Sequence, residues 1–397
     1  MLEFGFNNKY LIGVSGGPDS MFLLSELVKQ KPKEIVVCHV NYNFRSDSIN
    51  DQKIVEQFCN QHDLILEVKV IDPLIYQASN FNFEAWAREE RYNFFCEMGE
   101  KYQINNLLIA HNQNDQIETY LMQLRRQNLN NYWGIQKVST YKNMTVIRPM
   151  LDFKKSEILK KLEAGKIPYV IDVTNFDQRY ERNKIRSTLK ESDFGQYMDE
   201  ILMKNKQLEV EIKQAKKYVE KNLIEGELKI DKSFSKLNVD LIQRIVYQYF
   251  EKLDKTYLLH NRKKQTIVEI SKRLKTTTKP FWKIEIGDFF LIKDFAIIYL
   301  LYKDSIQIKS FIINNQDELY LVEEFINGRD LLHKIREDKE NYPYIITNDF
   351  EHYKTVTTYK NKKMNRYLID QKISYKKRIY KAVVYNIKNL KVLNSIN

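Results

Sequence analysis

Cysteine is scarce in this sequence, and long hydrophobic runs are lacking. The three cysteines, Cys38, Cys59 and Cys96, are too far apart to form a CxxC pair, which argues against a disulfide framework and against a zinc ribbon. No apolar stretch approaches the length of about 18 residues that a membrane-spanning helix needs, and the first residues lack the features of a secretory signal. We therefore expect a cytoplasmic protein in a reducing environment.

Acidic residues are outnumbered by basic ones. The 397 residues include 64 Lys and Arg against 52 Asp and Glu, which gives a net charge of +12. Such a balance favours a polyanionic partner, nucleic acid before an anionic membrane. Enrichment of Lys, Asn, Ile and Tyr throughout the chain explains the charge equally well, so composition alone does not choose the partner.

Apolar runs alternate with helical patterns through the first 150 residues. Runs without strict in–out alternation predict strands that are buried on both faces, at 10–14, 34–40, 64–71 and 106–111. Amphipathic patterns between them predict helices at 19–30, 50–62, 82–102 and 114–126. This order predicts an α/β fold with a doubly wound, mostly parallel, Rossmann-like sheet, in which ligands bind beyond the carboxyl ends of the strands. Ser15, His39 and His111 lie at or just after three strand ends and should therefore meet at one rim.

The rest of the chain divides into two further regions. A charged stretch from Asp199 to about Leu223 carries apolar residues at helical spacing, which predicts a long connecting helix. The next stretch is helical first and then strand-like, with a turn at Gly287-Asp288, and a Tyr- and Lys-rich α+β region follows. We therefore predict an α/β domain at 1–198, a connecting helix with a mainly helical middle domain at 199–304, and a small α+β C-terminal domain at 305–397.

Glycine is rare as well, with only 11 in the chain, yet two are adjacent in Ser15-Gly16-Gly17-Pro18-Asp19-Ser20. Two glycines between a strand and a helix indicate a backbone that adopts positive φ or approaches another group closely. The helix that follows offers unpaired N–H groups and the positive end of its dipole to a phosphate, and Ser15 and Ser20 add hydroxyl donors. Asp19 fits this loop if it holds Mg²⁺ that in turn binds the phosphates.

Two common phosphate-binding motifs do not match this loop. A Walker A motif needs a Lys directly before Ser20, and a dinucleotide fingerprint needs GxGxxG; both are missing. The remaining alternative is a tight turn with an incidental helix cap.

The stretch SGGPDS after a strand resembles the pyrophosphate loop of the N-type ATP pyrophosphatases. The resemblance implies cleavage of ATP between its α and β phosphates, adenylation of a carbonyl oxygen, and displacement of AMP by a nucleophile. Six residues leave several members open, including synthetases that make GMP, NAD or argininosuccinate, and tRNA thiolases.

Further segments resemble one of these families, the tRNA(Ile)-lysidine synthases. In the family's order, they are CHVNYNFR (38–45), FEAWAREERYNFF (83–95), LLIAHNQNDQIET (107–119), IRPML (147–151), DVTNFDQRYERNKIR (172–186) and the tail segment 362–386. The resemblance implies that ATP adenylates O2 of the wobble cytidine in an isoleucine tRNA with anticodon CAU, and that the ε-amine of free lysine attacks C2. It also implies that 1–198 is the catalytic PP-loop domain and that 305–397 binds tRNA.

The resemblance extends to carboxylates and arginines. Asp115 and Glu118, three residues apart on one helical face, match the carboxylates that recognise lysine, and one of them could take the proton that the amine loses. A carboxylate pair that merely favours a helix N-terminus is the alternative. Arg182 and Arg186 could stabilise charge on the α-phosphate, or bind the lysine carboxylate or the tRNA backbone, although their segment alone is typical of a solvated basic helix.

Nucleotide binding is expected at the loop and at three residues beyond it. Arg88 and Arg91 share a helical face and either contact phosphate or pair with neighbouring glutamates. His39 and His111 either bind the nucleotide or are structural, and no third soft ligand is spaced to make them a metal site. Asp19, the carboxylate of the loop, is the expected ligand of Mg²⁺. The expected ATP contacts are Ser15, Gly16, Gly17, Pro18, Asp19, Ser20, His39, Arg88 and His111.

The tail carries a basic run. Residues 360–381 contain nine Lys or Arg and one acidic residue, and Tyr367, Tyr375 and Tyr380 lie among them. This pattern suits phosphate contacts and base stacking on tRNA, with a solvated surface as the alternative. The expected tRNA contacts are Lys362, Lys363, Lys376, Lys377 and Arg378.

Two features depart from the family pattern. The family usually has two histidines and two aspartates in the segment that here reads His111-Asn112-Gln113-Asn114-Asp115, and the glycine-rich stretch that follows is reduced to 125–135, which contains a single glycine. A tRNA 2-thiolase of the same superfamily stays an alternative, although the cysteines are poorly spaced for sulfur transfer. A non-catalytic RNA-binding protein is the other, and the sequence leaves open whether the chain forms a homodimer.

Overall fold

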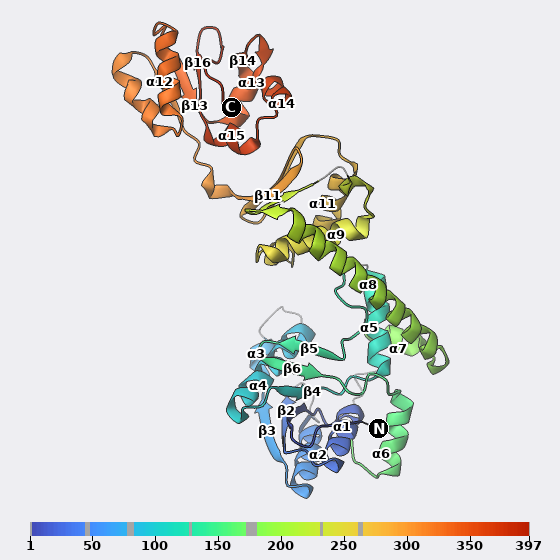
Figure 1. The fold of residues 1–397 in the computed structure, drawn as a ribbon. Coiled ribbons are helices and arrows are strands. Elements are labelled where there is room, and N and C mark those ends of the chain that lie inside the picture. The colour runs from blue at the N-terminus through green and yellow to red at the C-terminus, as the bar shows by residue number, and fades with distance from the viewer. Residues whose placement is uncertain are drawn as a thin grey trace. The chain divides into compact units, whose positions relative to one another are not determined.

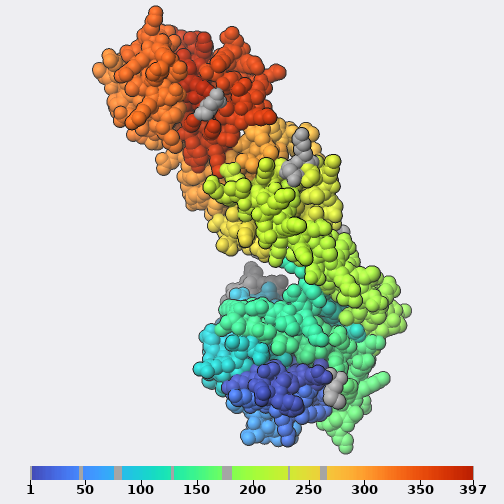
Figure 2. Space-filling model, viewed as in Figure 1, coloured from blue at the N-terminus to red at the C-terminus, as the bar shows by residue number. Residues whose placement is uncertain are grey.

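The computed structural model of the chain describes residues 2–43, 48–77, 83–126, 129–171, 181–230, 233–260 and 265–396. The chain forms two compact units, 1–209 and 210–397, which we describe separately (Figure 1). Figure 2 shows the same view of the chain in space-filling form. Parts of two segments with family resemblance, 44–45 and 172–180, lie outside the described residues.

The described part of the first unit contains a six-stranded sheet with the order β3-β2-β1-β4-β6-β5. Every neighbouring pair is parallel except β5 and β6, which form an antiparallel hairpin. The strands are β1 (Lys9–Gly13), β2 (Glu34–Asn41), β3 (Ile65–Val70), β4 (Asn106–Leu108), β5 (Val138–Tyr141) and β6 (Met144–Ile147). The chain proceeds outward from β1 in both directions, so β1 and β4 flank the switch point at which ligands bind in such sheets.

Helices cover both faces of this sheet. The helices of the first unit are α1 (Pro18–Lys29), α2 (Ser48–Gln61), α3 (Leu74–Gln77), α4 (Phe83–Tyr102), α5 (Gln113–Arg126), α6 (Lys155–Ala164) and α7 (Glu181–Thr188), followed by the short 3₁₀ turn η2 (Glu191–Asp193). Ile12 and Val37 face one hydrophobic cluster with α1, α2 and α6, whereas Leu11 and Val36 face another with α4. Neighbouring strand residues thus point into opposite cores, which explains why these strands lack alternation with polar residues.

The predicted α/β fold is confirmed. The four predicted strands and four predicted helices of this region correspond to β1–β4 and to α1, α2, α4 and α5, with ends that differ by a few residues. The hairpin of β5 and β6 was not predicted, because its strands are only four residues long.

The second unit begins within the long helix α8 (Phe194–Asn222), which confirms the predicted connecting helix. Its first part combines 3₁₀ turn η3 (Phe234–Lys236) and helices α9 (Val239–Lys252), α10 (Tyr257–His260) and α11 (Gln265–Thr276) with an antiparallel sheet of order β7-β8-β11-β10-β9. The strands are β7 (Leu223–Ile224), β8 (Glu227–Lys229), β9 (Phe281–Ile286), β10 (Phe289–Asp294) and β11 (Ile297–Tyr302). The predicted turn at Gly287-Asp288 joins β9 and β10, but this region holds more sheet than the mainly helical domain that we expected.

The last part of the second unit is α+β. A three-stranded sheet has the order β12-β13-β16, and helices and short strands surround it. The elements are η4 (Lys303–Ser305), β12 (Ser310–Ile313), η5 (Gln316–Glu324), α12 (Gly328–Glu337), β13 (Tyr344–Thr347), α13 (Phe350–Val356), β14 (Thr358–Tyr359), β15 (Lys362–Lys363), α14 (Met364–Asp370), α15 (Tyr375–Tyr380) and β16 (Val383–Asn386). Ile292 and Tyr299 share a hydrophobic cluster with Phe350 and Tyr353, so this part packs on the preceding sheet. The boundary that we predicted at residue 304 stays a prediction.

None of the helices in the described ranges is both long enough and apolar enough to cross a membrane.

Candidate functional site

The loop between β1 and α1 has the backbone geometry that its glycines predict. Gly16 has φ +86°, and a Cβ atom there would lie 2.9 Å from the carbonyl oxygen of Asp51. The Gly16 carbonyl accepts a hydrogen bond from the Val170 amide at 3.0 Å. Both positive φ and close approach therefore require glycine at this position.

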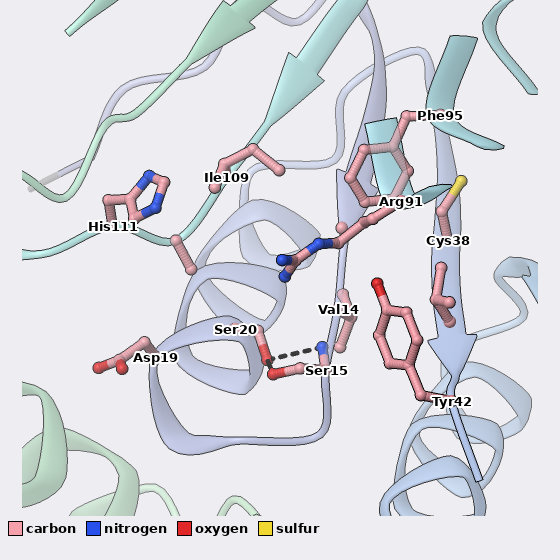
Figure 3. Close-up of a pocket in the computed structure, with 13 residues that line it drawn as sticks. Val14, Ser15, Asp19, Ser20, Cys38, Tyr42, Arg91, Phe95, Ile109 and His111 are labelled. Carbon is pink, nitrogen blue, oxygen red and sulfur yellow. Dashed lines mark hydrogen bonds between the residues drawn. The ribbon is translucent and has the colours of Figure 1, made fainter. Parts of the chain in front are cut away.

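The two serines of the loop stabilise its shape. The Ser15 amide donates to Ser20 Oγ at 3.1 Å (Figure 3). The Ser20 hydroxyl donates to the Gly17 carbonyl at 3.0 Å. The Gly17 amide donates to Ser15 Oγ at 3.3 Å. By contrast, the amides of Gly16, Asp19 and Ser20 make no hydrogen bond to any residue that the structure describes. These three N–H groups, at the start of α1, can accommodate an anion.

A pocket of about 200 Å³ opens beside this loop, beyond the carboxyl ends of the strands. Figure 3 shows the Arg91 guanidinium extending into it from α4. Arg91 Nε is buried and has no hydrogen-bond partner within the described ranges, so this cation is available to a ligand. The lining combines apolar and polar residues: Gly13, Val14, Ser15, Asp19, Ser20, Cys38, Val40, Tyr42, Arg91, Phe95, Ile109, Ala110 and His111.

Asp19 lies at the pocket rim between two partners from distant parts of the chain. Lys155 Nζ contacts Asp19 Oδ2 at 2.5 Å, and Asn112 Nδ2 donates to Asp19 Oδ1 at 3.0 Å. Burial raises the pKa of the Asp19 carboxyl, while the ammonium of Lys155 opposes this change. The carboxylate is therefore held beside a cation that α6 supplies.

Magnesium chemistry fits this carboxylate only with help from a substrate. Across the described ranges, no group of three or more His, Cys, Asp or Glu could hold a metal ion. Mg²⁺ commonly binds one or two carboxylates and completes its shell with phosphate oxygens and water. One carboxylate beside three unpaired amides agrees with that arrangement.

A charge cluster joins α5 and α7. Arg182 donates from Nη2 to Asp115 Oδ1 at 2.9 Å and from Nε to Glu118 Oε2 at 2.7 Å. Arg186 donates from Nε to Glu118 Oε1 at 2.7 Å. The side chain of Glu118 is fully buried, whereas that of Asp115 is 18% exposed. These four residues, which the sequence analysis named as catalytic candidates, therefore form one contact cluster in the fold.

The two asparagines that depart from the family pattern, Asn112 and Asn114, have structural roles here. Asn112 and Asp115 exchange hydrogen bonds, because each side chain accepts from the other's amide at 3.0 Å at the start of α5. Asn114 Oδ1 accepts from the Lys155 amide at 3.0 Å. Both asparagines therefore connect the carboxylates of α5 to the pair formed by Asp19 and Lys155.

The two predicted histidines occupy different environments. His39 is 2% exposed, its Nδ1 lies 2.8 Å from the Val14 carbonyl, and burial lowers its pKa. His39 is not among the residues that line the pocket, so its burial favours a structural role. His111 does line the pocket, and burial lowers its pKa to about 4.

The arginines of α4 and two further residues add to the sequence prediction. Arg91 lines the pocket, whereas the Arg88 guanidinium lies over the Tyr92 ring at 4.8 Å and its contact with nucleotide stays a prediction. Lys155 and Arg148 were missed. The IRPML segment contains Arg148, which could have identified it, whereas Lys155 reaches Asp19 only through the packing of α6 against α1.

The basic run of the second unit is only partly a surface. Lys362, Lys363 and Lys377 are exposed, and Lys376 forms an ion pair with Glu227. Arg378 was expected to contact tRNA, but its side chain is 2% exposed and donates from Nε to the Ile373 carbonyl. Tyr375 is buried as well, at 3%, and stacks on Phe281. Arg378 is therefore part of the core, because the short helix α15 turns this side chain inward.

Comparison with known proteins agrees with the geometry of the first unit. A family model described as the PP-loop domain matches residues 4–192. The tRNA(Ile)-lysidine synthase of Mesoplasma florum is 50% identical over 98% of this chain and 97% of its own length, and that of Mycoplasma mycoides is 49% identical over the same shares. The tRNA(Ile)-lysidine synthase of Mycoplasma genitalium is 31% identical over 74% of this chain and 98% of its own length. The chain therefore belongs to the tRNA(Ile)-lysidine synthase family.

Proposed function

We propose that this chain is an ATP-dependent ligase that joins the ε-amine of lysine to C2 of the wobble cytidine in an isoleucine tRNA with anticodon CAU. The reaction forms an adenylated cytidine with release of pyrophosphate, and lysine then displaces AMP. Membership of the family, with about half of the residues identical along nearly the whole chain, is the observation that carries this proposal. A cytoplasmic location follows from the use of tRNA and ATP.

The loop and pocket suit the triphosphate. The unpaired amides of Gly16, Asp19 and Ser20 lie where the outer phosphates would bind, and Arg91 extends toward the pocket interior, where it can compensate charge on the α-phosphate. Asp19 would hold Mg²⁺, which neutralises charge on the phosphates and on the leaving pyrophosphate. Lys155 is the cation that Asp19 would exchange for the metal.

The charge cluster suits the second substrate. Asp115 is the carboxylate that can meet the ammonium of lysine first, since it is partly exposed and has one arginine partner. Glu118 can meet lysine only if Arg182 or Arg186 gives up a hydrogen bond, because both of its oxygens are engaged. An arginine released in this way would be free to bind the carboxylate of lysine or the α-phosphate.

A thiolase is the weaker alternative. All three cysteines are buried, and burial raises the pKa of each thiol, that of Cys59 to about 12. Sulfur transfer depends on thiolate, which these surroundings disfavour. We therefore propose no sulfur chemistry for this chain.

The test is incubation with radiolabelled lysine, ATP and tRNA of anticodon CAU, with label in RNA and formation of AMP as readouts. We expect both in equal amounts. Asp19→Ala should abolish both and leave tRNA binding unchanged, whereas Asp152→Ala, at a side chain 69% exposed, should change neither. Sulfur incorporation from a persulfide donor without lysine incorporation would overturn the proposal, and so would tRNA binding without AMP formation.

A further inference from the structure

Arg148 is a buried arginine that the proposed reaction has not used. It follows β6 directly and is 6% exposed. Strand β6 pairs in parallel with β4, and the Ile109 amide donates to the Ile147 carbonyl at 3.0 Å. The segment after β4, which leads to His111, therefore runs beside Arg148 at the carboxyl edge of the sheet.

The guanidinium of Arg148 is fixed on two sides. Its Nη1 donates to the Gln136 carbonyl at 2.8 Å and to Ser139 Oγ at 2.9 Å. Its Nε–H donates to His111 Nδ1 at 3.2 Å. The hairpin of β5 and β6 thus anchors one end of the group, and the other end meets the imidazole.

This contact determines which nitrogen of His111 carries a proton. A guanidinium has donors only, so Nδ1 must be the acceptor, and the proton of a neutral imidazole then resides on Nε2. Burial lowers the pKa of His111 most. Asp115 on α5 raises it, whereas Arg148, Arg182 on α7 and Arg88 on α4 lower it further, so the balance favours the neutral ring.

We propose that Arg148 is a positioning residue that fixes His111 as a neutral imidazole whose Nε2–H is offered to an anionic oxygen of the substrate. This inference rests on the proposed function only for the identity of that oxygen, which would belong to a phosphoryl group of the nucleotide. Three arginines that act on the imidazole make its surroundings suited to an anion. His111 lines the pocket on the same rim as Asp19 (Figure 3).

The same geometry excludes His111 as the base that takes the amine proton. Protonation at Nδ1 would require the bond from Arg148 to break, and Nε2 already carries a proton. The proton lost by lysine must therefore go to another acceptor, and Asp115 is the partly exposed carboxylate nearby. His111 contributes a hydrogen bond to the transition state instead.

The test is NMR of the full chain labelled with ¹⁵N-histidine, in which the His111 signals are identified by their loss in His111→Gln. In the wild type, we expect a single neutral form with a protonated Nε2 from about pH 5 to about pH 8. Arg148→Met keeps a long side chain but removes every donor. In this variant we expect both neutral tautomers of His111 and a His111 pKa of about 6.5. We also expect the pH profile of lysine transfer to gain an acid limb at about pH 6.5.

Controls separate positioning from stability. Ser139→Ala removes one acceptor of Arg148 but not the bond to His111, and should keep the single tautomer. Arg273→Met, at an exposed arginine of α11, should change nothing. If Arg148→Met does not fold, Arg148→Lys serves in its place, because one ammonium cannot span Gln136 and His111 together.

Retention of a single, non-titrating Nε2–H form in the Arg148 variant would overturn the inference, even if activity fell. The outcome is independent of the proposed function. If the wild type transferred no lysine but the tautomer changed as expected, the role of Arg148 would stand and the proposed substrate would be wrong.

Discussion

Asn112 donates a hydrogen bond from Nδ2 to Asp19 Oδ1 at 3.0 Å, across 93 residues of sequence. Asn112 is 3% exposed, and its side-chain oxygen accepts from the Asp115 amide. One amide therefore connects the carboxylate of the phosphate loop to the helix that carries the candidate lysine site. A neutral donor at this position leaves the negative charge of Asp19 available to a cation.

The first prediction concerns this amide. Asn112→Asp places a second carboxylate against Asp19 in a buried site and replaces the donor by an acceptor, so we expect binding of Mg²⁺·ATP to weaken by about tenfold or more. Calorimetric titration with Mg²⁺·ATP measures this effect. Asn60→Asp, which adds the same charge at an exposed position of α2, is the matched control and should bind as the wild type does. Equal affinity of both variants would contradict a link between Asn112 and Asp19 in nucleotide binding.

The second prediction concerns the buried carboxylate of the charge cluster. Glu118→Gln should lower the free energy of unfolding by about 3 kcal/mol, because two arginines lose their common buried partner. Asp115→Asn should cost less, about 1 kcal/mol, since this side chain is partly exposed and has one arginine partner. Urea unfolding provides both values, with Glu181→Gln, at a side chain 41% exposed, as the control.

A double-mutant cycle tests whether this cost comes from the arginines. The destabilisation caused by Glu118→Gln should shrink by about 1–3 kcal/mol when Arg186→Met is already present. Additive effects would mean that Glu118 stabilises the fold through other contacts.

The sequence predicted those parts of the site that are local. The loop at 15–20 and the start of α5 each contain their functional groups within a few residues. They follow β1 and β4, which are parallel neighbours, so the order of the strands places both at the same edge of the sheet. Arg148 and Lys155, by contrast, act through His111 and Asp19, which lie 37 and 136 residues away in the sequence. The pattern of charges along the chain does not show which distant residues come into contact. Helical spacing places Arg88 and Arg91 on one face but does not show which of them lines the pocket.

The burial of Arg378 could not be predicted from the sequence either. Arg378 lies in a run of basic residues that is typical of a surface, yet α15 is only six residues long and directs one of its cations inward. There Arg378 lies over the rings of Phe295 and Phe350. Only the packing of α15 against β10 and α13 reveals this, because the apolar partners come from distant segments.

The third prediction concerns the pH dependence of stability. The pKa of His111 is about 4 in the folded chain, whereas an unperturbed histidine has a pKa of about 6.5. Between these values the unfolded chain binds a proton that the folded chain does not, so the free energy of unfolding should fall as the pH decreases from about 6.5 to about 4. The full effect corresponds to about 3 kcal/mol.

Comparison of two histidine variants isolates this contribution. Over this pH range, the free energy of unfolding of His111→Gln should fall less steeply than that of the wild type. The difference between the two slopes should correspond to about one bound proton. His62→Gln, at an exposed histidine of the turn after α2, should follow the wild type. Denaturant unfolding at several pH values measures both, and identical slopes for all three proteins would mean that His111 titrates alike in the folded and unfolded chains.

The last prediction concerns the basic run of the second unit, in which exposed lysines and the buried Arg378 should differ in kind. If Lys362, Lys363 and Lys377 bind tRNA phosphates, their combined replacement by Ala should weaken binding and reduce the slope of log K against log salt by about one unit for each phosphate that is no longer neutralised. Arg378→Met should instead lower stability and leave that slope unchanged, because a side chain that is 2% exposed releases no counterion.

Combined replacement of three exposed lysines of the first unit, Lys31, Lys33 and Lys53, is the control for net charge. A salt slope that does not respond to the first set, or that responds to the control set equally, would show that this run is only a solvated surface.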